Sequence, residues 1–173
     1  MTFLEQLRDY FHGERFEALA FIAPAGLVLF VLGVAAMKSE GGPFGVGVAV
    51  PCVIFGLVLL GTGLGVGLRT AGQVTTLEAE LASSPKAMVE KELPRMRKVN
   101  ANWPVYLGVW TALVVAGLAL RFGLKADWAH GVGPALLLVG AMGFLIDGFA
   151  ERRARPYTKA LEALAAEHGV ATP

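Results

Sequence analysis

Asp147 is an ionisable residue that lies within an apolar run near the C-terminus. A carboxylate in a hydrocarbon environment is costly, so such a residue marks a proton relay, an ion path or a charge pair. Glu151, Arg152 and Arg153 follow it a few residues later. Pairing with a neighbouring arginine is therefore the predicted role of Asp147, and proton or ion coupling is the alternative.

Residue types that carry hydrolytic or metal chemistry are present, but they do not share the spacing of a site. His12, His130 and His168 lie in three different parts of the chain, whereas a zinc site needs three or four convergent ligands. No serine, cysteine or histidine occurs in a nucleophile motif, and the single cysteine, Cys52, cannot form an intramolecular disulfide. The sequence therefore predicts no catalytic residue, no metal and no cofactor, and a protein that is not an enzyme.

A basic cluster precedes the third apolar run, and an acidic residue lies close to it in the sequence. Juxtamembrane cations of this kind commonly attract anionic lipid, at about 1 kcal/mol each. Setting the orientation of the chain in the membrane is the default interpretation of the cluster. The alternative is a docking surface for a protein partner, with acidic residues alongside. The residues concerned are Arg95, Arg97, Lys98, Asn100, Trp103 and Glu90.

Glycines recur at a spacing of four in the second apolar run. Gly61 with Gly65, and Gly63 with Gly67, form two GxxxG pairs, which let helix backbones approach closely in lipid. Packing within the protein is the predicted role, and formation of a homo-oligomer is the alternative. The run does not read GxGxxG and follows no predicted strand, so neither nucleotide nor nucleic-acid binding is indicated.

Four apolar runs must position these residues. Hydrophobic residues make up 55% of the 173-residue chain and charged residues only 17%, against about 25% charged residues in soluble domains. A helix needs about 20 apolar residues to cross the hydrocarbon core of a membrane. We therefore predict an all-α, polytopic membrane protein with a four-helix bundle. Its expected spans are residues 17–37, 44–68, 104–124 and 132–150.

Polar segments divide the chain further. We expect an amphipathic helix over residues 1–15, transmembrane hairpins over 16–68 and 104–150, a cytoplasmic helical hairpin over 69–103, and a C-terminal helix over 151–173.

Several residues indicate where these helices begin and end. Thr2 and Glu5 have the spacing of a capping box, and Gly13 is predicted to end the first helix. Ser84 is predicted to cap the second arm of the helical hairpin, and Gly169 to cap the last helix. Because no loop residues follow Leu68, the second span is expected to continue into the hairpin as one long helix.

Lysine and arginine are distributed unevenly over the two sides of the predicted membrane. Twelve of the 15 lie in the N-terminal segment, the central segment and the tail, whereas Lys38, Arg121 and Lys125 lie on the opposite side. Positive residues are enriched in cytoplasmic segments. Both termini and the central hairpin are therefore predicted to be cytoplasmic.

Two stretches carry a resemblance to a known class of proteins. Residues 92–99 (ELPRMRKV) enter the third span, and residues 148–157 (GFAERRARPY) leave the fourth. Together with the topology, they resemble small four-span proteins of Gram-negative bacteria that are encoded beside toxins delivered by contact-dependent secretion, including type VI and Rhs-type effectors. Such proteins are immunity factors that protect the producer's inner membrane. The resemblance carries over no functional residue.

The leading functional hypothesis is therefore a non-enzymatic inner-membrane binding protein that neutralises a membrane-targeting or pore-forming toxin. Its partners would be the lipid bilayer and a protein toxin or another membrane protein. The alternatives are a small oligomeric channel or transporter that uses Asp147, and a tetraspan scaffold or regulator.

Overall fold

The computed structural model describes residues 1–170, and every regular element in that part of the chain is a helix. The all-α prediction is confirmed. The elements are α1 (Phe3–Glu17), the π-helical turn η1 (Ala18–Ile22), α2 (Ala23–Glu40), α3 (Pro43–Ser83), α4 (Pro85–Ala101), α5 (Trp103–Gly123) and α6 (Asp127–Glu167).

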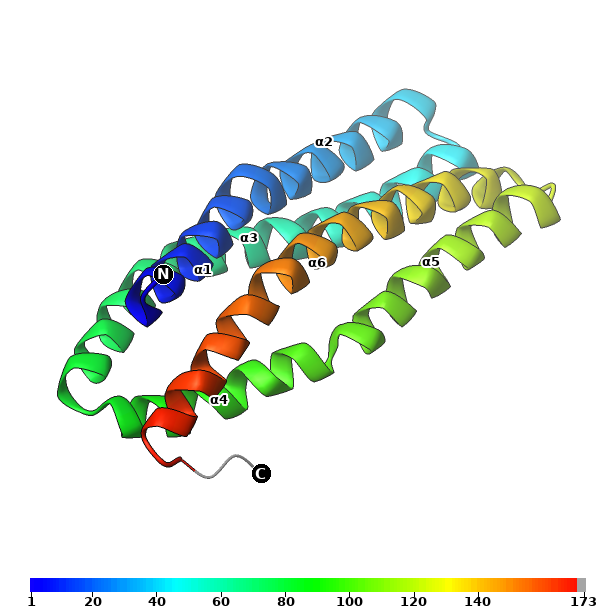
Figure 1. The fold of residues 1–173 in the computed structure, drawn as a ribbon. Coiled ribbons are helices and arrows are strands. Elements are labelled where there is room, and N and C mark those ends of the chain that lie inside the picture. Colours follow the sequence, from blue (N-terminus) through cyan, green and yellow to red (C-terminus); the bar gives the residue numbers. More distant parts are fainter. Residues whose placement is uncertain (171–173) are drawn as a thin grey trace.

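Four continuous helical segments are long and apolar enough to cross a membrane, as the sequence predicts. They are Phe3–Glu40, Pro43–Ser83, Pro85–Gly123 and Asp127–Glu167. They form two antiparallel hairpins whose turns lie at one end of the molecule, while α4, the start of α1 and the end of α6 lie at the other (Figure 1). The first turn contains Gly41, whose φ of 54° is the left-handed conformation that glycine adopts without strain.

In the bundle, the helices α2, α3, α6 and α5 pack as a row, and at the other end of the molecule α1 and α4 also pack on α6. The helix α2 packs on α3, α3 packs on α6, and α6 packs on α5, whereas α5 makes no comparable contact with α2 or α3. Consequently α5 buries only Trp103 and Gly117. One whole side of α5 is left as an exposed apolar surface.

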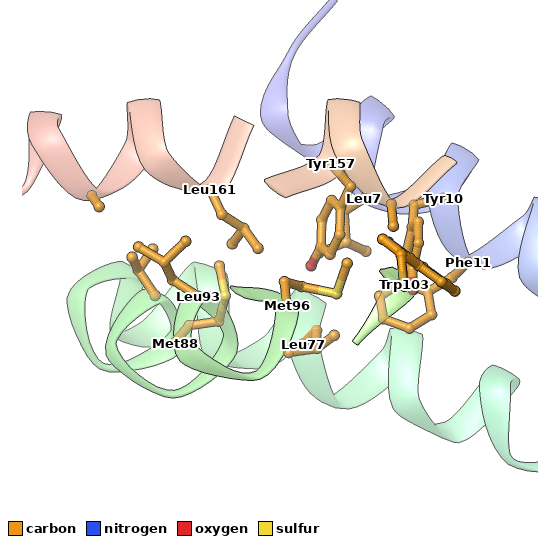
Figure 2. Packing of buried hydrophobic residues seen from close by; sticks show 13 residues of the cluster. Leu7, Tyr10, Phe11, Leu77, Met88, Leu93, Met96, Trp103, Tyr157 and Leu161 are labelled. Carbon is orange, nitrogen blue, oxygen red and sulfur yellow. The ribbon is translucent and has the colours of Figure 1, made fainter. Parts of the chain in front are cut away.

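The larger of the two hydrophobic core clusters lies at the end that holds α1, α4 and the end of α6, and we call this end the cap. The cap consists of α1, the end of α3, α4, the start of α5 and the second half of α6 (Figure 2). The helical stripes expected in the hairpin, represented by Leu77, Leu93 and Met96, all face this core. The long α3 is continuous through residue 68 into the cap, as predicted.

The three predicted capping residues all lie at helix ends, and two of them have the expected capping geometry. The Thr2 N–H donates to Glu5 Oε2 at 2.7 Å, and the Glu5 N–H donates to Thr2 Oγ1 at 3.3 Å, which completes the capping box. Gly169 has a φ of 62° at the end of α6 and also confirms its predicted role. Ser84 occupies the N-cap position of α4, as predicted, but its side chain makes no capping hydrogen bond.

Gly13 does not end the first helix, which corrects the prediction made for it. The helix α1 continues to Glu17 and passes through η1 into α2. A Cβ atom at Gly13 would lie 2.5 Å from Cδ of Arg153, so glycine permits close packing of α1 on α6. The irregular turn instead falls just before Pro24, which has no backbone N–H to donate. In the same way, the predicted C-terminal helix is the uninterrupted end of α6.

The two GxxxG pairs have different surroundings. A Cβ atom at Gly63 would lie 2.5 Å from the backbone N of Ala23 and 2.8 Å from the carbonyl O of Ala18. Gly67 is similarly closed off by the side chain of Leu19. Gly61 and Gly65 have no atom within 4 Å of their Cβ positions. Packing inside the protein therefore explains one pair, and the other lies on an open face of α3.

This difference predicts opposite effects of two neighbouring substitutions. Gly63→Ala should lower the free energy of unfolding by about 1–3 kcal/mol, because two backbones must separate. Gly61→Ala should leave it unchanged or raise it by up to about 1 kcal/mol, because alanine favours helix in an open position. Unfolding in detergent, followed by circular dichroism, measures both, and equal effects would contradict the assigned packing.

Candidate functional site

Aromatic rings attach α1 to α6 in the cap. The Tyr157 side chain is 1% exposed, and the Tyr10 ring stacks on it with a centroid distance of 4.6 Å and an interplanar angle of 10°. Phe11 contacts the same ring edge-on at 5.8 Å (Figure 2). Burial raises the pKa of Tyr10 to about 12, and the nearby Glu14 carboxylate adds to the increase. The first helix is thereby held against the last.

A buried carboxylate connects α4 to the same ring. Glu92 accepts two hydrogen bonds from Arg95, at 2.7 and 2.5 Å, and a third from the Tyr157 hydroxyl at 3.3 Å. The hydrogen bonds with Glu92 also raise the pKa of Arg95. Arg95 is therefore used within the cap and is not part of an open docking surface.

The other residues of the predicted docking surface separate into two groups. Arg97 pairs with Glu162 at 3.3 Å, the Asn100 amide donates to Thr158 at 2.8 Å, and the Trp103 indole N–H donates to Asn100 at 3.0 Å. These bonds attach the α4–α5 junction to α6 or stiffen it. Lys98 and Glu90 are exposed. Four of the six residues thus make hydrogen bonds within the cap, and the other two are exposed.

Asp147 has a partner that the sequence does not suggest. Its Oδ2 accepts a hydrogen bond of 2.5 Å from the indole N–H of Trp110 on α5. The predicted pairing of Asp147 with a neighbouring arginine is therefore wrong. Arg153, the nearest inward-facing arginine, pairs with Glu17 instead.

The ion pair between Glu17 and Arg153 lies where α1 ends and crosses α6. The side chains are 7% and 25% exposed, and the bond joins Arg153 Nη2 to Glu17 Oε2. Among the described residues, Glu17 Oε1 and Arg153 Nε are buried and have no hydrogen-bond partner. The sequence places Glu17 at the first residue of the first predicted span, but nothing local indicates Arg153 as its partner.

A lateral groove begins at this ion pair and runs between the first helical segment and α6. Its volume is about 560 Å³. Apart from the ion pair its lining is apolar, and several of the lining rings and aliphatic chains are exposed on the surface of the molecule. The lining residues are Gly13, Phe16, Glu17, Phe21, Ala25, Met142, Leu145, Ile146, Phe149 and Arg153. The arrangement suits a hydrophobic ligand with one polar end.

A second cavity, of about 570 Å³, lies between the α4–α5 junction and α6. Asn100 and Trp103 from the predicted docking surface line it, together with Arg155 and Lys159. Its polar lining contains charges of both signs, including Glu151. Two residues of the predicted docking surface thus line this second cavity. It shares no lining residue with the apolar groove, and it faces the other side of α6.

The buried ion pair predicts a strongly non-additive response to substitution. Arg153→Gln leaves Glu17 buried without its charge partner and should lower the free energy of unfolding by about 3–5 kcal/mol. The double variant Glu17→Gln/Arg153→Gln should recover a large part of that loss, because no buried charge remains. Denaturant unfolding of the single and double variants measures the coupling.

A second arginine on α6 supplies the control for this experiment. The Arg155 side chain is 68% exposed and pairs with Glu151 on the surface. Arg155→Gln should therefore cost less than about 1 kcal/mol. Equal losses for the two single arginine variants would show that the Glu17–Arg153 pair is not effectively buried.

Comparison of this chain with known proteins gives no relative from which a function could be transferred. No family model, no curated protein and no solved structure matches this chain. The groove with its terminal ion pair and the open glycine face of α3 are therefore interpreted from their own chemistry.

Proposed function

We propose that the chain is a polytopic protein of the bacterial inner membrane with both termini and the cap in the cytoplasm. Four segments of sufficient length and hydropathy support insertion. The segments that hold twelve of the 15 lysines and arginines belong to the end with both termini, and the two hairpin turns form the opposite end (Figure 1). Positive charge is retained on the cytoplasmic side of membranes.

Two serine-to-cysteine substitutions test this orientation. Ser39 lies at the end of α2 beside the first hairpin turn, and Ser83 lies at the end of α3 in the cap; both are exposed. A membrane-impermeant maleimide applied to intact inner membranes from outside should label Ser39→Cys and spare Ser83→Cys until the membrane is permeabilised. The native Cys52 is fully buried and provides the background. The reverse labelling pattern would contradict the proposed orientation.

Within the membrane, the chain acts as a non-enzymatic binding protein that neutralises a membrane-targeting toxin. The resemblance of residues 92–99 and 148–157 to four-span immunity proteins is the first support. The structural observation that carries the proposal is the open face of α3, where Gly61 and Gly65 have no neighbour within 4 Å of their Cβ positions. A hydrophobic helix of a toxin can approach the backbone closely there.

Capture on this face would prevent toxin helices from associating with one another. A pore requires several amphipathic or apolar segments to assemble, and a segment packed on α3 has its contact face covered. Three leucines are exposed on α3 near the two glycines, namely Leu57, Leu64 and Leu68. Their side chains provide apolar contacts around the flat surface that Gly61 and Gly65 form. Binding in this way needs no bond to be made or broken.

Protection of cells provides the direct test. Co-expression of the chain with the toxin encoded beside its gene should rescue growth, whereas Gly61→Leu/Gly65→Leu should abolish rescue because leucine side chains prevent close approach. Gly108 on α5 is equally open to the outside, so Gly108→Leu serves as the matched control and should still protect. Absence of a toxin from the gene neighbourhood, or rescue by the double glycine variant, would contradict the proposal.

A further inference from the structure

The lateral groove has a length that corresponds to half of a bilayer. Met142 and Arg153 mark its two ends on α6. At about 1.5 Å per residue, the helix between them spans about 16 Å. A hydrocarbon core of about 30 Å gives about 15 Å for one leaflet. The groove therefore matches one acyl chain of a single leaflet.

A transmembrane helix does not match the groove. A spanning helix would extend past the groove's inner end at Met142. An acyl chain is thinner and ends within the leaflet, so it matches the length of the groove.

An exposed cation lies where the groove meets the cap. Glu17 pairs with Arg153 at the groove's end, and Arg152 lies with Arg153 along the adjoining surface. The Arg152 side chain is exposed and makes no ion pair with any described residue. Asp9 lies on the same surface.

We propose that this groove binds one anionic glycerophospholipid of the cytoplasmic leaflet. One acyl chain lies between Phe21 on the first segment and Phe149 on α6, both of which are exposed. The phosphate lies at the cap end, beside Arg152. This inference rests on the membrane insertion proposed above, and it uses a different face of the molecule from the glycine face on α3.

Native mass spectrometry of the purified full-length chain tests the site. The chain is released from bilayers that contain equimolar phosphatidylglycerol and phosphatidylcholine with identical acyl chains. We expect one phosphatidylglycerol to be retained per chain in preference to phosphatidylcholine. Arg152→Gln should lower this retention about fivefold, the effect of losing one interfacial cation. Ala25→Phe should abolish it, because Ala25 lines the groove and phenylalanine fills it.

Matched variants elsewhere control for general effects of charge and bulk. Arg69→Gln removes another exposed cation from α3, and Ala112→Phe adds a ring to the exposed side of α5; both should retain phosphatidylglycerol like the parent chain. Equal retention of the two lipids, or unchanged retention by Ala25→Phe, would overturn the proposed lipid site. Such a result with correct cysteine labelling and full toxin protection would leave the proposed function standing. Incorrect labelling would overturn membrane insertion itself.

Discussion

The packing of α1 on the cap end of α6 is the contact on which the rest of the arrangement depends. The Tyr10 ring stacks on Tyr157 at 4.6 Å, and Glu17 pairs with Arg153 farther along the same two helices. Because α1 continues through η1 into α2, fixing α1 also fixes where the first hairpin meets α6. Glu92 accepts a hydrogen bond from Tyr157 as well, so one side chain connects three helices that are distant in the sequence.

The cap and the long helices are held together by two different kinds of packing. In the cap, large side chains such as Phe11 and Met96 are fully buried, and removal of apolar surface from water provides the driving force. Between the long helices, Gly26 and Gly56 face each other's backbones, and a Cβ at Gly56 would lie 2.6 Å from the N of Phe30. In the membrane setting proposed above, lipid is as apolar as leucine, so close backbone contact replaces burial there. The larger side chains of these segments consequently point outward.

Local sequence pattern predicts the elements well and their partners poorly. The capping box at Thr2, the continuous α3 and the apolar stripe through Leu93 depend on residues within a few turns of one another, so periodicity and spacing suffice. Gly13 misleads because its role is contact with Arg153, which a rule about helix breaking ignores. The hydrogen bond from Trp110 to Asp147 depends on how α5 is rotated against α6. No pattern within either helix contains that information.

The position of the Glu17–Arg153 pair needs an explanation other than stability. Removing two charges from water costs several kcal/mol per ion, and apolar side chains of similar volume often pack as stably. The pair also leaves Glu17 Oε1 and Arg153 Nε without partners among the described residues, so its geometry is not optimised for the pair alone. What it does define is the point at which the apolar groove ends and the cationic surface around Arg152 begins. An apolar pair at the same place would extend the groove into the cap and remove that boundary.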